Sequence, residues 1–442
     1  MKLLKKLIPT YFILLIVLML LLFFSCLIPQ KNIEQKVKES ASYMTQQGED
    51  WFVKELGRKI RQDNDTDAIM INIAYSIDEN NVFYSMLAAR RNYVKNVTTH
   101  TVSESEGDLK FDGKKFNMIK ELKDTTNKKN IKSFPYFKYW HGYLTIIRPL
   151  LVFFNIKQIR TILTIISLIL LIILSINVYR KTNIYYALSI FIGYISFDFF
   201  AWFNILQGMF VILISLVAGI IVSSKNMKKD SFNTFLFIIG GLTSFFDFLT
   251  FPLVSLLMPI LIRYIVYNDE ENNKEKLKKV IINLICSIAG YALIWVSKWI
   301  ISDIIYNTNV IKVAITEVLY RTGLFPQYDK LFSKDMPNYL FFNSLTNNIL
   351  YSINYLTTII SFMFLFIFVK LSSERKILES IKKLLVPFIL SIIVILWYII
   401  ISQHSWYHFY FTYKNMIIIY ITKLLFISNQ IINLKNRKNM LK

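Results

Sequence analysis

Apolar residues occur along this 442-residue chain in runs that are separated by short polar stretches. A helix that crosses a bilayer needs about 20 predominantly apolar residues, and ten runs approach or reach that length. The pattern therefore predicts an all-α integral membrane protein with about ten transmembrane helices. The runs lie near 7–27, 161–179, 184–202, 205–223, 231–249, 251–268, 280–300, 346–369, 384–402 and 414–428.

Lysine and arginine residues gather in alternate connections between these runs. The cytoplasmic loops of membrane proteins carry an excess of basic residues, so alternate loops are predicted to face the cytoplasm. The short turns around Asn204 and Phe251 carry no Lys or Arg, which fits the opposite face. We expect a multi-pass protein of the bacterial plasma membrane with both termini in the cytoplasm. The basic groups lie at 2–6, 180–181, 225–229, 274–279, 370–383 and 435–438.

The lengths of the connections divide the chain further. The first run follows three lysines, as in a signal peptide, but no small-x-small cleavage site precedes Pro29, so a retained anchor is favoured over cleavage. A short apolar stretch at 143–154 predicts an interfacial or re-entrant helix. We expect an anchor at 1–29, a large extracytoplasmic domain at 30–143, a multi-span domain at 144–430 with an outer loop at about 301–345, and a basic cytoplasmic tail at 431–442.

Composition narrows the classes of function. The chain is 54% hydrophobic and 18% charged, with a formal net charge of +22. In a soluble protein that charge would suggest binding to nucleic acid. Here the basic residues lie in alternate loops and indicate which loops face the cytoplasm, so no nucleic-acid partner is expected. Cys26 and Cys286 lie in or beside apolar runs, which argues against a disulfide framework. The chain has no phosphate-binding loop, dinucleotide-binding glycine pattern or nucleophile elbow.

Three carboxylates at alternate positions, Asp63, Asp65 and Asp67, form the densest acidic cluster. They could bind a divalent cation through oxygen ligands, or one could act as a general base. The alternative is a solvated turn, since the Gly and the distal Glu of a calcium loop are missing. The segment becomes apolar directly after Asp67, which makes that residue the preferred candidate of the three.

Two similar segments each place an aspartate near the end of an apolar run, at Asp198 and Asp247. Both are flanked by phenylalanines and followed by a turn and another apolar run, which suggests duplicated hairpins or chance similarity in a Phe-rich chain. An ionisable residue in a membrane span is costly unless it faces a cavity or a partner. The two are therefore candidate functional residues, unless they only reach the aqueous interface.

Three of the four histidines stand among aromatic residues at span ends. His141 precedes Arg148, and His404 and His408 precede Lys414. The spacing of four residues places His404 and His408 on one face of a helix, where they could ligate a metal or bind phosphate. Together these basic groups suggest an outer pocket for a phosphate or diphosphate head group, against the alternative of incidental interfacial histidines.

The layout resembles the GT-C class of membrane glycosyltransferases, which carry an essential carboxylate in the first outer loop. The resemblance implies a polyprenyl-phosphate sugar donor, with the membrane lipid as partner, used at the extracytoplasmic face. The acidic cluster lies about forty residues beyond the first span, whereas the family has its carboxylate close behind that span. Catalytic roles are thereby predicted for Asp67, Asp198 and Asp247, and substrate contacts for Asp63, Asp65, His141, Arg148, His404, His408 and Lys414.

The sequence also resembles uncharacterised polytopic proteins of Gram-positive bacteria, which implies no activity. A transporter or flippase for a lipid-linked substrate is the first alternative, because the aspartate-bearing hairpins could line a path. A non-catalytic membrane assembly protein is the second. The pattern assigns no cofactor beyond a divalent cation that the acidic cluster could hold, and it sets no oligomeric state.

Overall fold

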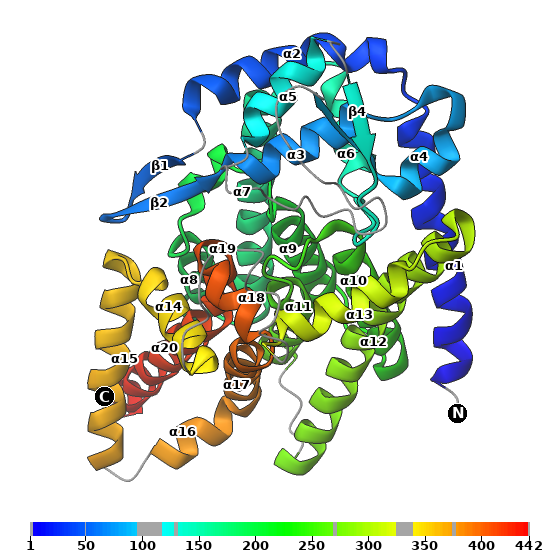
Figure 1. The fold of residues 1–442 in the computed structure, drawn as a ribbon. Helices are drawn as coiled ribbons and strands as arrows, with labels where there is room; N and C mark the ends of the chain where they lie inside the picture. Colours follow the sequence, from blue (N-terminus) through cyan, green and yellow to red (C-terminus); the bar gives the residue numbers. More distant parts are fainter. Residues whose placement is uncertain are drawn as a thin grey trace.

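The computed structural model is mostly helical, with two small antiparallel sheets of two strands each. In Figure 1 a layer of short helices and strands lies at one end of the molecule, above a body of longer helices. The structure describes residues 3–48, 50–94, 117–127, 131–267, 272–323, 339–373 and 377–440.

The layer at the top of Figure 1 is formed by the described part of residues 30–143, which we call the cap. Strands β1 and β2 pair with Asp50 opposite Asp63, across a turn in which Leu56 and Gly57 both have positive φ. Asp63 then caps α3, because its side chain accepts a hydrogen bond from the Thr66 backbone N–H at 3.1 Å. The cap elements are α2 (Gln30–Gln47), β1 (Asp50–Glu55), β2 (Arg58–Asp63), α3 (Asn64–Tyr75), η1 (Glu79–Asn81), α4 (Val82–Ala88), β3 (Arg91–Val94), α5 (Met118–Thr126) and β4 (Ile131–Phe134).

The cap is not a separate domain. Ile33 and Val37 of α2 and Ile71 of α3 belong to one continuous apolar core that also contains Leu163 and Leu216 of the helical body. A large independent extracytoplasmic domain is therefore not evident in the described residues, and that prediction needs correction. The helices α2, α3 and α5 pack on one another, and α2 also packs on α6 and α7, so the apolar residues of the cap continue into the core of the body.

The helical body contains the remaining elements. These are α1 (Leu4–Cys26), α6 (Leu144–Leu151), α7 (Ile156–Lys181), α8 (Ile184–Ile195), η2 (Phe199–Asn204), α9 (Met209–Ser224), α10 (Lys229–Phe246), α11 (Leu253–Val266), α12 (Asn273–Tyr306), α13 (Val310–Arg321), α14 (Leu340–Ser352), α15 (Tyr355–Ser373), α16 (Ile377–Lys383), α17 (Leu385–Ile400), α18 (Ser402–Tyr407), α19 (Phe409–Thr412), η4 (Tyr413–Met416) and α20 (Ile417–Met440). The short helix α6 lies where a short apolar helix was expected. Of the expected outer loop at 301–345, residues 324–338 lie outside the described residues.

Five helical segments in the described residues are long and apolar enough to cross a membrane, and a sixth is counted if α16 and α17, bent by 84°, form one span. The five are α1, α7, α12, α15 and the continuous stretch Phe409–Asn436. Helices α8, α9 and α11 are apolar but shorter. The 12 residues of α8 extend about 18 Å, well below the hydrocarbon thickness. A multi-pass membrane protein is thus supported, with fewer full-length spans than the apolar runs suggested.

The two aspartate-bearing hairpins share their order but differ in backbone conformation. In both, an apolar helix ends, a turn carries the aspartate, and a second apolar helix follows. Asp198 has a left-handed φ of 57°, whereas Asp247 has φ −94°. The similar sequences therefore form different turns, and the two aspartates have different partners.

Candidate functional site

A cavity of about 130 Å³ lies where the cap meets the helical body. One wall is α3 of the cap, and the opposite wall is formed by α18 and α19, which lie below α3 in Figure 1. We call it the cap-side cavity. Its lining residues are Thr66, Ile69, Met70, Ile73, Tyr136, Tyr139, His141, Tyr143, Gln207, Phe248, Arg321, His404, His408, Tyr410 and Phe411.

His404 is held in the cavity wall by contacts on both ring nitrogens. Nε2 lies 2.7 Å from the Leu249 carbonyl oxygen, and Nδ1 lies 3.0 Å from the Arg321 guanidinium. Because a carbonyl oxygen only accepts and a guanidinium only donates, these partners select the neutral tautomer with the proton on Nε2. Burial and the charge of Arg321 lower the pKa of His404 to about 3, which keeps the ring neutral.

His408 stands beside His404, with the two ring centroids 4.7 Å apart. This confirms that the four-residue spacing brings both imidazoles to one face. Its Nδ1 lies 3.3 Å from the Tyr410 hydroxyl, and its ring stacks on Phe411 at 5.0 Å. Desolvation and the neighbouring His404 lower the pKa of His408 well below its usual value, so the ring carries no charge at neutral pH and is a weaker base than a free imidazole.

His141 and Tyr143 supply polar atoms that the protein itself leaves unused. His141 Nε2 lies 3.0 Å from the Tyr136 carbonyl oxygen. Within the described part of the chain, His141 Nδ1 and the Tyr143 hydroxyl are buried and have no hydrogen-bond partner. Buried polar atoms are nearly always paired, so two unsatisfied groups in one cavity wall are the expected sign of a site for a ligand or ordered water.

Arg321, at the end of α13, brings a cation to the cavity. Its Nε donates to Glu317 Oε1 at 2.8 Å, and Lys138 Nζ lies 3.4 Å from Glu317 Oε2. Although burial opposes ionisation, Arg321 and Lys138 lower the pKa of Glu317 to about 2. Two cations thus share one carboxylate, which leaves Arg321 with attraction for an anion in the cavity.

Asp67 lies on α3 with the cavity-lining residues but faces the other way. It is fully buried, and its Oδ2 accepts hydrogen bonds from Arg160 Nε and Nη2 at 2.9 and 2.6 Å. The backbone N–H groups of Leu206 and Gln207 donate to its two oxygens at 2.7 and 3.0 Å. A fully buried carboxylate that is paired with an arginine and accepts four hydrogen bonds is suited to joining the cap to α7 and to the segment before α9, not to reacting with a substrate.

Asp63 and Asp65 also lie outside the lining of the cap-side cavity. Asp63 is occupied as the cap of α3, where Thr66 donates its backbone N–H and its hydroxyl. Among the described residues, no three His, Cys, Asp or Glu side chains come together in a way that could hold a metal ion. Alternate spacing along a strand-to-helix junction sends the three aspartates in different directions, which is why they do not converge.

Asp198 belongs to a second buried cluster, between the β1–β2 hairpin and the C-terminal helices. Its carboxylate accepts hydrogen bonds from the Arg58 guanidinium and from the Tyr413 hydroxyl. Arg58 also stacks on the rings of Tyr351 and Tyr413, at 4.8 and 5.0 Å. Nearby, Glu55 accepts the backbone N–H of Phe200 at 3.0 Å. Burial, with a further contribution from Asp198, raises the pKa of Glu55 to about 7.

Asp247 organises the turn that forms one edge of the cap-side cavity. It accepts the Thr250 backbone N–H at 3.0 Å and also the Thr250 hydroxyl. The turn places Phe248 in the cavity lining and the Leu249 carbonyl against His404. Asp247 therefore acts on the cavity through its neighbours and does not line it.

Two predicted basic residues are also placed elsewhere. The Arg148 guanidinium is fully buried and donates to the carbonyl oxygens of Ser25, Ala74 and Ile28, which joins α1, α3 and α6. Lys414 lies over the Phe251 ring at 5.4 Å, near the Asp198 cluster. Of the ten residues predicted for the site, only His141, His404 and His408 line the cap-side cavity.

The sequence argument missed Arg321 and the tyrosines of the cavity. Arg321 lies in the expected outer loop at about 301–345, to which the sequence argument assigned no site residue. Its pairing with Glu317 at i, i+4 is a local signal for a helix, but nothing local places that helix beside His404. Nothing in the sequence distinguishes Tyr136, Tyr139 and Tyr410 from the other tyrosines of the chain, which has 26 in all.

Comparison with known proteins found no family model, no curated protein and no solved structure that matches this chain. The resemblance to GT-C glycosyltransferases therefore stays a prediction. The functional argument has to come from the chemistry of the cap-side cavity.

Proposed function

We propose that this protein is a membrane glycosyltransferase that takes a sugar from a polyprenyl-phosphate donor at the extracytoplasmic face. The observation that carries the proposal is the cap-side cavity, in which Arg321 lies beside neutral histidines and a wall of tyrosines. An arginine binds a phosphate through two parallel hydrogen bonds, and aromatic faces stack on sugar rings. A phosphate linked to a sugar presents both of these surfaces to one cavity.

The proposed topology agrees with the position of the cavity. We infer that the shorter apolar helices α8, α9 and α11, together with α10, also lie in the membrane, which with six candidate spans would give ten passes and both termini in the cytoplasm. In Figure 1 α16 and the beginning of α12 lie at the end of the body away from the cap. Basic residues cluster at both places, so the positive-inside rule supports an extracytoplasmic cap.

The residues of the cavity have distinct roles in the proposed reaction. His408 accepts the proton of the acceptor hydroxyl, whose oxygen then forms a bond to the anomeric carbon of the sugar. The bond from that carbon to the phosphate oxygen breaks, and the electron pair leaves with the lipid phosphate. Arg321 stabilises the negative charge on that leaving group. Tyr143 and His141 direct their unused polar atoms to sugar hydroxyls.

In this proposal Asp67, Asp198 and Asp247 are positioning residues. Asp67 fixes the α3 wall, and Asp247 fixes the turn that holds Phe248 and the His404 contact. Asp198 holds the hairpin against the C-terminal helices. A general base needs a lone pair that the substrate can reach, and Asp67 is fully buried and paired with Arg160.

The test is transfer from a radiolabelled polyprenyl-phosphate sugar by purified full-length protein in lipid nanodiscs. Arg321→Gln and His408→Gln should each lower transfer by about 100-fold, the typical size of one electrostatic or acid–base contribution. Arg180→Gln, a matched charge change on an exposed arginine of α7, should leave transfer unchanged. Donor binding with no transfer in any variant would contradict catalysis, and no donor binding at all would contradict the proposal as a whole.

A transporter for the same kind of substrate is the second candidate. Specific support comes from the 84° bend between α16 and α17 and from the short apolar helices, since transporters use broken helices to build central sites. Proteoliposomes with labelled donor on one side distinguish the two. Movement of intact donor across the bilayer supports transport, whereas appearance of a glycosylated acceptor supports transfer.

A further inference from the structure

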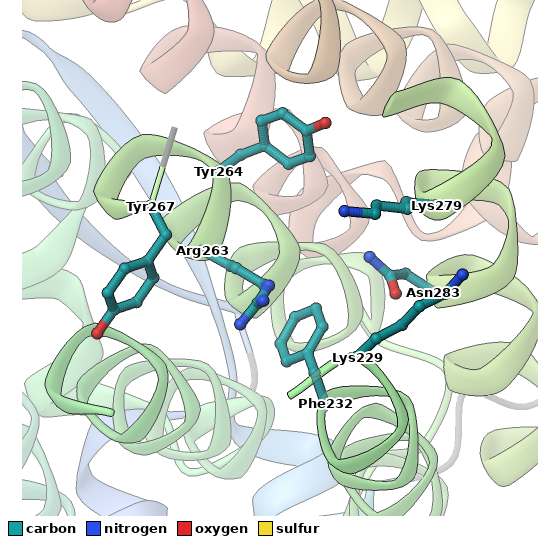
Figure 2. A pocket seen from close by; sticks show the side chains of 7 residues that line it. All are labelled: Lys229, Phe232, Arg263, Tyr264, Tyr267, Lys279 and Asn283. Carbon is teal, nitrogen blue, oxygen red and sulfur yellow. The ribbon is translucent and has the colours of Figure 1, made fainter. Parts of the chain in front are cut away.

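Two pockets of the described chain differ in what they can hold. The pocket among the ends of α10, α11 and α12, which Figure 2 shows with Phe232 and Arg263 in its wall, measures about 40 Å³ and has room for about three water molecules. The cap-side cavity measures about 130 Å³. A cavity of about 150 Å³ holds one benzene ring, so the cap-side cavity suits a ligand group with a single ring and not two.

One wall of the cap-side cavity is an apolar stripe on α3. Thr66, Ile69, Met70 and Ile73 follow the spacing i, i+3, i+4 and i+7, which places them on one face of the helix. The Thr66 hydroxyl donates to Asp63 Oδ2 at 2.8 Å, so its proton is already used. Beyond Thr66 the wall presents only aliphatic carbon and a thioether. We call Ile69, Met70 and Ile73 the α3 stripe.

Other segments bring polar groups to the same cavity. Gln207, just before α9, lines it with a side chain that is 7% exposed, and the Gln207 amide makes no hydrogen bond with any described residue. Its position is fixed, because the Gln207 backbone N–H donates to Asp67 Oδ1 at 3.0 Å. His141 Nδ1 and the Tyr143 hydroxyl are also unpaired among the described residues. The cavity thus has unused donors and acceptors away from α3, whereas the side chains of the α3 stripe carry none.

This division of the walls selects among sugars. A hydroxyl placed against the α3 stripe would lose its water and gain no hydrogen bond, which is unfavourable. A methyl group in the same place buries apolar surface, which is favourable. Most hexoses carry a hydroxymethyl group beyond the ring, whereas a 6-deoxyhexose carries a methyl group there and keeps its ring hydroxyls. A 6-deoxyhexose therefore matches the walls better than its parent hexose does.

We propose that the sugar bound in the cap-side cavity is a single 6-deoxyhexose, with its methyl group against the α3 stripe and its hydroxyls toward Gln207, His141 and Tyr143. Gln207 accepts a hydrogen bond from one hydroxyl and donates to the next, since an amide carries both functions. The inference rests on the transfer reaction proposed above and specifies its substrate. It also gives Asp67 a second effect on the cavity, because Asp67 holds the backbone of a residue that contacts the sugar.

The experiment compares sugars that differ only in the hydroxyl beyond the ring. Full-length protein in lipid nanodiscs receives polyprenyl-phosphate donors that carry L-rhamnose or L-mannose, and in a second pair D-fucose or D-galactose. The two members of each pair share every ring hydroxyl. In the wild type the 6-deoxy member of at least one pair should have a kcat/KM about tenfold to a hundredfold above that of its partner, the range over which an apolar pocket discriminates against an added hydroxyl.

Ile69 allows a matched change in the α3 stripe, because Val and Thr have the same shape and differ in one methyl or hydroxyl group. Ile69 is partly exposed, so both variants should fold. Ile69→Val should keep the preference, whereas Ile69→Thr should reduce it about fivefold, since the new hydroxyl can pair with the extra hydroxyl of the parent hexose. The preference is a ratio between two donors in one preparation, so a loss of folded protein does not change it.

Gln207→Met tests the polar contacts. The backbone N–H that binds Asp67 remains, and an apolar chain of similar length replaces the amide. Transfer from both members of a pair should fall by a similar factor, about fivefold to tenfold, while their ratio stays as in the wild type. Unchanged transfer from both members would overturn the role of Gln207.

The outcomes separate this inference from the proposed reaction. Equal transfer within both pairs, or faster transfer from the parent hexose, would overturn the 6-deoxy assignment and leave the transferase activity in place. Faster transfer from a donor that carries N-acetylglucosamine would do the same and would show that the cavity accommodates an acetamido arm. A preference that Ile69→Thr leaves unchanged would overturn the contact with the α3 stripe. No transfer from any donor would contradict the proposed reaction, and the assignment of its sugar with it.

Discussion

Two polar regions of this protein are equally buried but differ in how completely their groups are paired. Asp67 and Arg160 are both fully buried, and the two oxygens of Asp67 take hydrogen bonds from Arg160 and from two backbone N–H groups. In the cap-side cavity, His141 Nδ1 and the Tyr143 hydroxyl are just as buried and unpaired within the described chain. The polar groups around Asp67 need no ligand to complete their hydrogen bonds, whereas those of the cap-side cavity do.

Whether a buried polar group has a partner distinguishes structural residues from candidate functional residues better than the residue type does. Carboxylates were the first candidates for chemistry, yet Asp67 and Asp198 bind arginines that lie far away in the sequence. Removal of one member of such a pair leaves an uncompensated buried charge, which is costly to the fold. A group in the cavity, by contrast, can be changed at small cost to the fold and large cost to binding.

The largest expected effect is that of Asp67→Asn. It leaves the Arg160 charge buried without its carboxylate and should lower the free energy of unfolding by about 3–5 kcal/mol. Thermal unfolding in detergent measures the loss. Asp230→Asn, which weakens a surface pair with Lys6, should change stability by about 1 kcal/mol or less.

Arg160→Gln in the Asp67→Asn background should recover part of that stability, because the stranded charge is then gone. If Asp67→Asn were as stable as the control but had lost sugar transfer, the contrast between the two regions would fail. Asp67 would then regain its originally predicted catalytic role.

The second effect concerns acid pH. His404 has a pKa of about 3 in the fold, against a usual value of 6.5, so the unfolded chain binds a proton that the folded chain does not. Its stabilising contribution is complete above pH 6.5 and is lost as pH falls below it, by about 1.4 kcal/mol per pH unit. His404→Gln should therefore reduce the pH dependence of the melting temperature between pH 7 and about 5. An unchanged profile would show that His404 is already protonated in the fold.

The smallest expected effect comes from removing single hydroxyl groups, one without a partner and one with a partner. Tyr143→Phe removes a hydroxyl that has no partner, so stability should stay equal or rise slightly, while donor binding weakens. Tyr398→Phe removes a hydroxyl that donates to the Thr412 carbonyl at 2.9 Å and should cost about 1 kcal/mol without affecting binding. Isothermal titration with the lipid-linked sugar and thermal unfolding measure the two responses. Equal destabilisation by both changes would contradict an open hydroxyl in the cavity.

The sequence predicted those features that depend only on residues close together in the chain. The apolar runs indicated a helical membrane protein, and the short stretch before Asn155 indicated the short helix α6. The spacing of His404 and His408 placed their rings together, because residues four apart share a helix face. Each of these depends on neighbours within one or two turns of helix.

The sequence did not predict the number of full-length spans, which is five or six among the described residues instead of about ten. Helices α8, α9 and α11 end early where turns and the η2 segment interrupt apolar runs that continue in sequence. An apolar run indicates that its residues avoid water, but it does not show whether they face lipid or other helices. The separate domain expected at 30–143 is not evident for a related reason, since the apolar residues of the cap pack on one another and also continue into the core of the body.

The sequence by itself therefore determined that this is a mostly helical membrane protein and that His404 and His408 lie side by side. Only the tertiary structure decided that Asp67 meets Arg160, 93 residues away, and that Arg321 meets His404, 83 residues away. Local periodicity encodes which face of a helix is buried, whereas the partner on that face depends on which helices pack together. That pairing placed Asp67 and Asp198 against arginines and left unpaired polar atoms in the cavity wall, among the described residues.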